Sequence, residues 1–343
     1  MAKSRRTKSA GSTQAVQGLS IVIPLYNEAA GLVWLHERIG QVARGLKTKY
    51  NLPMEVVYVD DGSKDDTNRL ARALPAHPLD VQVVTLSRNF GKEAALLAGL
   101  DHARLGAVLF MDGDGQHPPA LVETLVGRWL DDGYDVVYTA KANRENEPWL
   151  RRVGVQAFYS LINWGARAPL PEDAGDFRLL SPRAAAALRQ LPERNRFFKG
   201  LATWIGFRQV RVDYDPAPRA HGRTTWNVWT LLGLSVEGLT SFSVAPLRFA
   251  SLLGLMLAAT ALLIGFWILF ETIFFGQDVP GYPSIAVGLM VLGGVQLMMI
   301  GVLGEYVGKL LSEVKSRPVY FVAEHSLKTA ADNAKPTPAR AAE

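Results

Sequence analysis

Residues 107–119 read AVLFMDGDGQHPP and join a short apolar run to an acidic, glycine-rich turn. The run 107–111 is bounded by turn-forming residues, which is typical of a buried β-strand. Asp112 and Asp114 follow it, one residue apart. This stretch therefore predicts a strand that delivers two carboxylates at its carboxyl end.

Three similar apolar runs precede this strand, and helical segments separate them. The predicted strands cover 19–25, 54–59, 81–86 and 107–111, and the predicted helices cover 28–42, a segment after Asp65, and 92–103. Strands that alternate with helices predict an α/β fold with a mostly parallel sheet and right-handed crossovers. Ligands of such sheets bind at the carboxyl ends of the strands.

Polar residues follow all four predicted strands. The clusters are 26–28 (YNE), 60–67 (DDGSKDDT), 87–92 (SRNFGK) and 112–119 (DGDGQHPP). Each cluster alone could be a solvated turn, but four at one edge of a sheet are hard to explain in that way. We therefore expect a single binding site built from these strand ends.

The acidic turn favours a divalent cation. Asp112 and Asp114 can face one hard cation, with Gln116 as a neutral oxygen nearby, and Mg²⁺ or Mn²⁺ is typically held by carboxylates together with substrate phosphates. A calcium loop is disfavoured because its sixth position, which needs glycine, is His117. Motifs of classical dinucleotide and P-loop sites are missing. What remains is a ligand whose diphosphate is bridged by a metal ion and whose ribose and base are bound by carboxylates. A nucleoside-diphosphate sugar matches that description.

The net charge of +5 is unevenly distributed: residues 19–140 are acidic overall and residues 141–223 are basic overall. Because arginine suits bidentate phosphate contacts, we expect the basic block to bind a phosphate at a membrane surface, although any single arginine could be an ordinary surface residue. A nucleic-acid partner is then not needed. The chain has no cysteine, which excludes disulfides and thiolate sites.

Two segments are long and apolar enough to cross a membrane. They cover 249–270 and 284–304, and neither contains a charged residue. Basic residues flank them outside the connecting loop, so the positive-inside rule places both chain ends in the cytoplasm. We expect 226–242 to form an interfacial helix, with a core helix as the alternative, and we expect disorder in residues 1–18 and from about 325 onward.

By its sequence blocks the chain resembles glycosyltransferase family 2 enzymes that use polyisoprenyl phosphate, the dolichyl-phosphate mannose synthase and bactoprenol glucosyltransferase group. The matching blocks are IVIPLYNE, VDDGSKDDT, SRNFGKEAALLAGL, MDGDGQHPP, AGDFRLLS, RFFKGLATWIGF, SFSVAPLR and EVKSRPVY. The resemblance implies a GT-A fold, a UDP-sugar or GDP-sugar donor, Mg²⁺ or Mn²⁺, and inversion at the anomeric carbon. Two C-terminal membrane helices look most like the bactoprenol branch, which implies undecaprenyl phosphate as acceptor and UDP-glucose as first choice of donor.

The resemblance also implies residue roles. The donor-binding residues would be Pro24, Tyr26, Glu28, Asp60, Asp61, Lys92, Asp112 and Gln116. The metal ligands would be Asp112, Asp114 and Gln116, and the catalytic residues would be Asp112, Asp114 and Asp176. The residues that bind the acceptor phosphate would be Lys141, Arg144, Arg152, Arg219 and Arg223. Two segments depart from the family pattern. Ala140-Lys141 stands where the family commonly has arginine in its Gly-x-Arg segment. Gly222-Arg223-Thr224-Thr225-Trp226 stands where the family has Gly-x-Ser-Lys before an aromatic residue, so the site has one cation fewer unless Arg223 takes the role of that lysine.

These inferences divide the chain into a disordered basic tail (1–18), a GT-A catalytic domain (19–223), interfacial helices (224–246), a two-helix transmembrane region (247–310) and a cytoplasmic C-terminal tail (311–343). We expect a multi-pass protein of the bacterial cytoplasmic membrane that contacts membrane lipid and can self-associate.

Two alternative functions remain. A processive polysaccharide synthase would carry a Gln-x-x-Arg-Trp segment and more membrane helices, and a non-catalytic nucleotide-sugar-binding subunit would have a broken acidic pair; Asp112 and Asp114 are both present.

Overall fold

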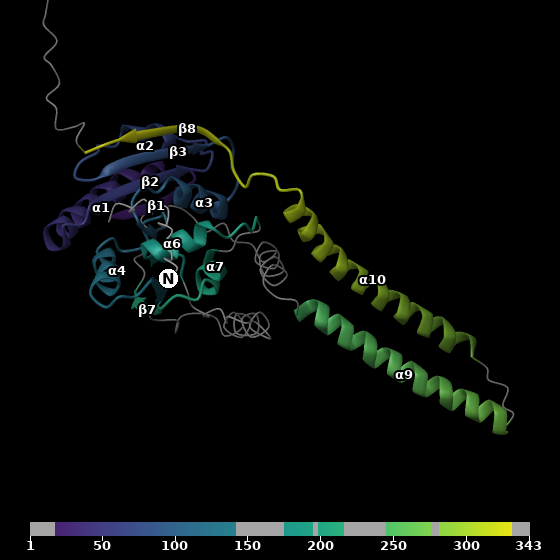
Figure 1. The fold of residues 1–343 in the computed structure, drawn as a ribbon. Coiled ribbons are helices and arrows are strands. Elements are labelled where there is room, and N and C mark those ends of the chain that lie inside the picture. The colour runs from purple at the N-terminus through teal and green to yellow at the C-terminus, as the bar shows by residue number, and fades with distance from the viewer. Residues whose placement is uncertain (1–17, 142–174, 195–197, 216–244, 276–280, 331–343) are drawn as a thin grey trace, which may run out of the picture.

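The alternating apolar runs form one mixed sheet (Figure 1). The computed structural model describes residues 18–141, 175–194, 198–215, 245–275 and 281–330. The described strands are β1 (Leu19–Leu25), β2 (Met54–Asp60), β3 (Asp80–Leu86), β4 (Ala107–Phe110), β5 (Val136–Lys141), β6 (Arg178–Leu180), β7 (Gln209–Tyr214) and β8 (Val322–Lys328). Their order across the sheet is β7-β5-β6-β4-β1-β2-β3-β8.

The pairing confirms the predicted mostly parallel sheet. β1 is parallel to both β2 and β4, β2 is parallel to β3, and β5 is parallel to β7. β6 and β8 are antiparallel to their neighbours. β1 has the predicted limits, while β4 ends at Phe110, one residue earlier than predicted.

Helices cover both faces of the sheet. The sheet-packing helices are α1 (Ala29–Tyr50), α2 (Thr67–Ala73), α3 (Lys92–His102), α4 (Leu121–Leu130), α6 (Pro182–Arg189) and α7 (Phe198–Trp204). α1 continues beyond the predicted end at 42, because Ala43 and Leu46 extend its buried face by another turn. α1, α2 and α4 contribute to one hydrophobic cluster, and α3, α6 and α7 contribute to the other.

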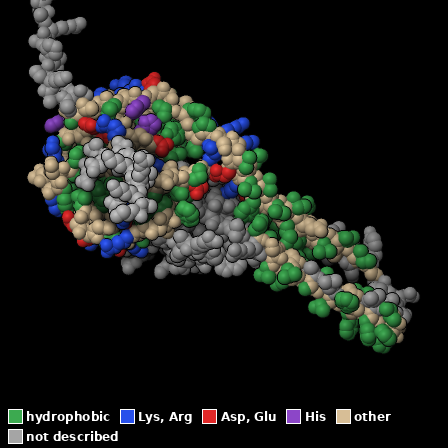
Figure 2. Space-filling view, in the orientation of Figure 1, with side chains coloured by type: hydrophobic (Ala, Val, Ile, Leu, Met, Phe, Trp, Pro, Cys, Tyr) green, Lys and Arg blue, Asp and Glu red, His purple; other side chains and the backbone are tan. Residues whose placement is uncertain are grey.

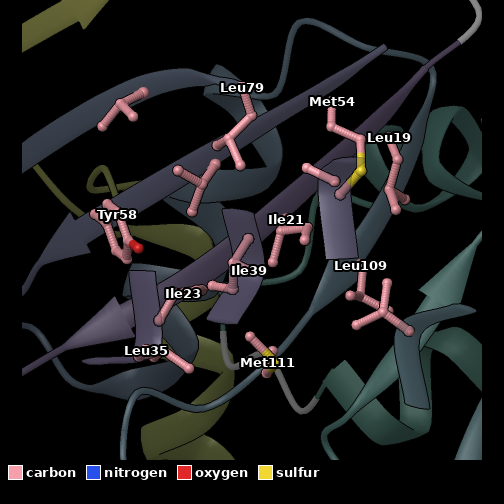
Figure 3. Packing of buried hydrophobic residues seen from close by; sticks show 14 of the residues in the cluster. Leu19, Ile21, Ile23, Leu35, Ile39, Met54, Tyr58, Leu79, Leu109 and Met111 are labelled. Atoms are coloured by element: carbon pink, nitrogen blue, oxygen red, sulfur yellow. The ribbon is translucent and has the colours of Figure 1, made fainter. Parts of the chain in front are cut away.

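Strand alternation explains how one sheet supports two clusters. Leu19, Ile21 and Ile23 of β1 lie in the same cluster as Leu35 and Ile39 of α1 (Figure 3). All five side chains are almost completely buried. The parallel core strands are thus buried on both faces, which is why they are continuous apolar runs in the sequence.

Gly99 sets the distance between α3 and the sheet. A Cβ atom at this position would lie 2.1 Å from Cγ1 of Val22 on β1. No side chain fits at that distance, so only glycine allows α3 to lie this close to the strand. The same helix begins at Lys92, and its close packing therefore fixes where the Lys92 side chain starts.

Two long helices extend away from the sheet domain, which we define as the described residues up to 215 together with β8 (Figure 1). They are α9 (Ala245–Phe275) and α10 (Tyr282–Val314), and they contain candidate membrane spans at Ala250–Phe275 and Val291–Val314. Their surface is mostly hydrophobic (Figure 2). Both predicted apolar segments lie within these helices, whereas the predicted interfacial helix 226–242 lies outside the described residues.

The prediction of disorder from about residue 325 is wrong for residues 325–328. These residues belong to β8, which follows α10 and pairs antiparallel with the edge strand β3. The side chains of His325 and Gln82 are 2.9 Å apart across this pair, and Tyr320 donates a 2.8 Å hydrogen bond to Asp101. The chain therefore returns from α10 to the sheet and is fixed at its edge.

Candidate functional site

A cleft of about 370 Å³ lies at the carboxyl ends of β1, β2, β3 and β4. The predicted strand-end clusters meet there, as expected for a parallel sheet. The cleft is lined by Pro24, Leu25, Tyr26, Glu28, Asp61, Asn89, Gly91, Lys92, Ala95, Asp112, Gly113 and Asp114. Seven of the residues predicted for the donor or metal site are therefore in one cavity, and Asp60 and Gln116 are not among its walls.

Asp61 holds the loop after β3 in place. Its carboxylate accepts hydrogen bonds from the backbone N–H groups of Phe90, at 2.7 Å, and Gly91, at 2.9 Å. Burial raises the pKa of Asp61, and the two N–H donors partly counteract that effect. Gly62 completes the approach of the two loops, because its φ of 70° is left-handed and a Cβ atom there would lie 2.7 Å from the Asn89 nitrogen.

Asp60 was predicted to bind the donor, but its carboxylate is hydrogen-bonded to neighbouring residues of the protein. Its carboxylate accepts a 3.0 Å hydrogen bond from the Ser63 N–H and a 2.8 Å hydrogen bond from the Asn68 side chain. The residue is buried. Asp60 thus orders the loop after β2, and a direct contact with donor stays a prediction.

The first strand end is fixed by contacts to the second. Asn27 has a left-handed φ of 58°, its N–H donates to the Ser63 hydroxyl at 3.0 Å, and the Glu28 N–H donates to the Thr67 hydroxyl at 2.8 Å. Tyr26, between these bonds and the sheet, is 44% exposed while it lines the cleft. An exposed aromatic ring on an ordered turn is available to stack on a planar ligand group.

Lys92 joins two carboxylates at the cleft. Its Nζ atom lies 2.6 Å from Oδ1 of Asp112 and 2.7 Å from Oδ2 of Asp176. Burial alone would lower the pKa of Lys92, but the negative charges of Asp176 and Asp112 outweigh it and raise this pKa. Asp176, which the resemblance implies to be catalytic, is therefore brought to the same point as the first residue of the acidic pair.

A second lysine extends this arrangement, and the family resemblance implies no specific role for it. Lys199 of α7 lies 3.3 Å from Oδ1 of Asp176. Burial would raise the pKa of Asp176, but the positive charges of Lys92 and Lys199 outweigh it and lower this pKa strongly. We call Lys92, Asp112, Asp176 and Lys199 the paired cluster.

Glu93 connects the paired cluster to α7. It follows Lys92 in the first turn of α3, and its carboxyl group accepts a 3.0 Å hydrogen bond from the backbone N–H of Phe198. Burial raises its pKa to about 7. The only sequence signal for Glu93 is its place in the first turn of a predicted helix. Its partner lies more than a hundred residues away along the chain.

His117 orients the acidic turn. Its Nδ1 atom accepts a 3.2 Å hydrogen bond from the Asp112 N–H, so the geometry assigns the ring proton to Nε2. The ring stacks on Phe177 with a centroid distance of 4.8 Å, and burial lowers its pKa. A neutral histidine thus supports the backbone of Asp112. Sequence reasoning had used His117 only to reject a calcium loop.

The acidic turn fits a divalent cation that also takes ligands from a substrate. Asp112 and Asp114 both line the cleft, and Asp114 accepts a 3.1 Å hydrogen bond from the Gln116 N–H, which folds the turn on itself. No group of three His, Cys, Asp or Glu side chains is placed to hold a metal within the described ranges. Two carboxylates plus diphosphate oxygens are a usual Mg²⁺ donor set, so the residues fit a cation that binds together with a nucleotide.

The predicted acceptor-phosphate residues are less fully described. Lys141 ends β5, but the structure does not describe its side chain. Arg144, Arg152, Arg219 and Arg223 lie outside the described residues. Their grouping around a phosphate stays a prediction.

The sequence matches the family described as Glycosyl transferase family 2 over residues 20–185. It is 42% identical over 306 residues to an uncharacterized glycosyltransferase of Synechocystis sp., which covers 89% of this chain and 95% of that protein. It is 39% identical over 304 residues to the SfII prophage-derived bactoprenol glucosyl transferase of Shigella flexneri, which covers 89% of this chain and 97% of that protein.

Solved structures with a similar arrangement are more distant in sequence. Glucosyl-3-phosphoglycerate synthase from Mycobacterium tuberculosis, in complex with Mn²⁺, UDP-glucose and phosphoglyceric acid, aligns with a TM-score of 0.42 and 18% identity. The alignment covers 65% of this chain and 78% of that chain.

Proposed function

Because the chain belongs to glycosyltransferase family 2, we propose that it transfers glucose from UDP-glucose to undecaprenyl phosphate, with inversion and with Mg²⁺ or Mn²⁺. The chain is a glycosyltransferase with a GT-A-like, mostly parallel sheet and two candidate membrane spans. Glucose and the polyprenyl acceptor are proposed because relatives matched over nearly their whole length are named bactoprenol glucosyl transferases.

The observation that carries the proposal is the meeting of Asp112 and Asp176 on Lys92 at the donor cleft. Asp112 and Asp114 are suited to hold a cation and the donor diphosphate, and Tyr26 is available to stack on the base. When bound, a divalent cation supplies neutralisation of the charge that develops on the departing nucleotide. The donor's anomeric carbon would then lie near Asp176.

Asp176 acts as an orienting group in this proposal. The acceptor phosphate is largely a dianion at neutral pH, because its second pKa is near 6, and so it needs little help from a base. The lowered pKa of Asp176, set by burial against the stronger effect of Lys92 and Lys199, also makes this carboxylate a weak base. Lys92 and Lys199 then hold Asp176 in a fixed position beside the nucleophile.

The proposed topology follows the apolar segments. α9 and α10 span the membrane, and the catalytic domain faces the cytoplasm together with both chain ends, in agreement with basic residues on either side of the helix pair. The basic residues of segment 1–18 would rest on anionic lipid. The cytoplasm of a bacterium would supply UDP-glucose, and its cytoplasmic membrane would supply undecaprenyl phosphate.

Radiolabelled nucleotide-sugars test the proposed function directly. Membranes that contain the full chain would be incubated with undecaprenyl phosphate and, in parallel, UDP-glucose, other UDP-hexoses or GDP-mannose, and lipid would then be extracted. We expect label in the lipid fraction with UDP-glucose and its loss in excess EDTA. Label with another donor would correct the sugar, and no lipid-linked label with any donor would contradict the function.

A further inference from the structure

A second cavity, of about 630 Å³, lies between the loop after β3 and the C-terminal end of α10. We call it the α10 groove. Its basic lining residues are Arg88, Arg194, Lys315 and Arg317, which we call the groove cations. Figure 2 shows basic side chains where the helix pair meets the sheet domain. The roles that the family resemblance implies do not include the groove cations, and none of these four residues lines the donor cleft.

None of the groove cations forms an ion pair with a carboxylate among the described residues. Glu313 is the acidic side chain beside them, and it accepts hydrogen bonds of 2.9 Å and 3.2 Å from the backbone N–H of Arg194. The Arg194 guanidinium donates to the Arg317 carbonyl oxygen, and the Arg88 guanidinium lies 4.4 Å from the Phe90 ring centre. Neither contact neutralises a charge, so the groove attracts anions.

The wall that α10 contributes changes from apolar to basic along one helical face. Gly308, Leu311, Ser312 and Lys315 line the groove and recur every three or four residues, which places them on one side of the helix. Gly308 and Leu311 lie within the candidate span that ends at Val314, and Lys315 comes directly after it. A ligand in this groove would therefore meet hydrocarbon-like surface at one end and positive charge at the other.

We propose that the α10 groove binds the phosphate group of a membrane lipid. The lipid chain would lie along Gly308 and Leu311, and the phosphate would contact the groove cations. Basic pockets beside membrane helices bind anionic head groups by this combination of charge and apolar surface. The lipid could be an anionic phospholipid or the polyprenyl phosphate itself, since both present a phosphate at the end of a hydrocarbon chain.

The groove also borders the donor cleft. Asn89 and Gly91 line both cavities, and Asp61 fixes the loop between them through the Phe90 and Gly91 N–H groups. A lipid phosphate in the groove would thus press on the same loop that forms a wall of the donor site. The inference depends on α10 spanning the membrane but not on sugar transfer.

Lipid retention by the full chain tests the inference without turnover. Protein in a neutral detergent would be titrated with phosphatidylglycerol or with undecaprenyl phosphate, and bound lipid would be counted by native mass spectrometry. The double variant Arg88→Gln/Lys315→Gln should bind at least one of these lipids about tenfold more weakly, because each basic residue near a lipid surface contributes measurably to binding. Loss for phosphatidylglycerol alone would identify a phospholipid, and loss for undecaprenyl phosphate alone would identify the acceptor.

Two controls separate the groove from general electrostatics. Arg44→Gln/Lys47→Gln removes the same charge from exposed positions on α1 and should leave both affinities unchanged. Gly308→Leu fills the groove without changing charge and should weaken binding, whereas Gly301→Leu, on the same helix but outside the groove lining, should not.

Unchanged affinity for both lipids in the double variant, or equal losses in the two double variants, would overturn the inference. Normal binding by Gly308→Leu would do so as well. Thermal unfolding of each variant checks that it folds. Because no donor is present in this assay, its failure would leave the proposed sugar transfer untouched.

Discussion

The paired cluster and the α10 groove differ in how their charges are balanced. In the paired cluster, Lys92 and Lys199 both contact Asp176, and Lys92 also contacts Asp112. In the groove, four cations line one cavity and none of them forms an ion pair with a described carboxylate. The two regions are separated by the loop 88–91.

The difference indicates two kinds of ligand. A site whose charges are already balanced can exchange one cation for another, so a metal–diphosphate unit could replace the ammonium group of Lys92 at Asp112 with little net change. A site with unbalanced positive charge gains by taking up an anion. The paired cluster is therefore suited to chemistry on a neutralised donor, and the groove is suited to holding a phosphate.

The largest effect is expected from Asp112→Ala. This variant removes a carboxylate from both the cation site and the paired cluster, and transfer should fall by at least about a hundredfold, as expected if several kcal/mol of charge stabilisation are lost. The readout is lipid-linked label in the presence of Mn²⁺ or Mg²⁺. Asp132→Ala is the control, because Asp132 is an exposed acid just after α4 that pairs with Arg128. Full activity of Asp112→Ala in excess EDTA would contradict the metal site.

Glu93 should make stability depend on pH. Its pKa is raised from 4.5 to about 7 by burial, so the folded state keeps this proton where the unfolded state has lost it. The resulting stability is present below about pH 4.5 and is lost as the pH rises through about 7, with a total of about 3 kcal/mol. Thermal unfolding in detergent between pH 5 and 8, at fixed salt, should show this decline.

The variant Glu93→Gln keeps an acceptor for the Phe198 N–H but does not ionise. Its stability should therefore decline less between pH 5 and 8 than that of the unmodified chain. Glu37→Gln, at an exposed position on α1, should leave the decline as it is. Parallel pH profiles for Glu93→Gln and the unmodified chain would rule out this role for Glu93.

Asp176→Asn tests whether the paired cluster positions or deprotonates the acceptor. The amide cannot act as a base, but it keeps the shape of the side chain and loses the charge that fixes Lys92 and Lys199. We expect turnover to fall about tenfold at pH 8, with KM for the acceptor changed as well, because misplacement of reacting groups lowers the rate. Complete loss of turnover with normal acceptor affinity and folding would show that Asp176 is a necessary base.

Lys92→Met tests the exchange of cations in the paired cluster. Without the ammonium group, Asp112 loses its cation and Asp176 keeps only Lys199, so Mn²⁺ should bind about fivefold more tightly in the absence of donor. Isothermal titration calorimetry measures this affinity. The Lys92 side chain is 41% exposed, which keeps the expected effect small.

Lys64→Met is the matched control for this variant, because Lys64 is exposed on the loop after β2 and lies outside the paired cluster. Its affinity for Mn²⁺ should equal that of the unmodified chain. If Lys92→Met bound Mn²⁺ no more tightly than the unmodified chain, a cation would not compete with the Lys92 ammonium group for Asp112. The idea that the paired cluster exchanges one cation for another would then be wrong.

The smallest effect is expected from Glu313→Gln beside the groove, and it has the opposite sign. The amide oxygen can still accept the Arg194 N–H, but the negative charge beside the groove cations is lost. Retention of phosphatidylglycerol or undecaprenyl phosphate should rise about twofold. Glu305→Gln on the same helix, outside the groove lining, is the control. A fall in retention would indicate that Glu313 shapes the groove more than it repels anions.

The sequence was sufficient for the sheet and for most of the cleft. Buried parallel strands leave apolar runs with sharp ends, so β1 and its neighbours could be placed almost exactly. Ligands of parallel sheets bind at the carboxyl ends of the strands, which predicted that Asp61, Lys92 and Asp112 would lie in one site. All three line the same cleft. The two helical segments were equally clear because spans need long uncharged runs.

What the sequence could not predict are contacts between distant segments. Glu93 and Phe198 meet because α3 and α7 pack on the same face of the sheet, and neither residue has a local pattern that indicates the other. β8 was missed for a related reason. The segment VAEHSLK is polar and largely exposed, so it has no apolar alternation, and its partner β3 lies far away along the chain.

β8 covers the edge of β3 with backbone hydrogen bonds, and it does so only after the chain has passed through both candidate spans. A stop codon just after α10 would leave the spans complete but would expose a row of unpaired backbone groups. Such an edge is a template for pairing with another chain. A truncated protein would therefore be lost to aggregation although its proposed donor site and its candidate spans were intact, and a genetic screen would misread that loss as a catalytic defect.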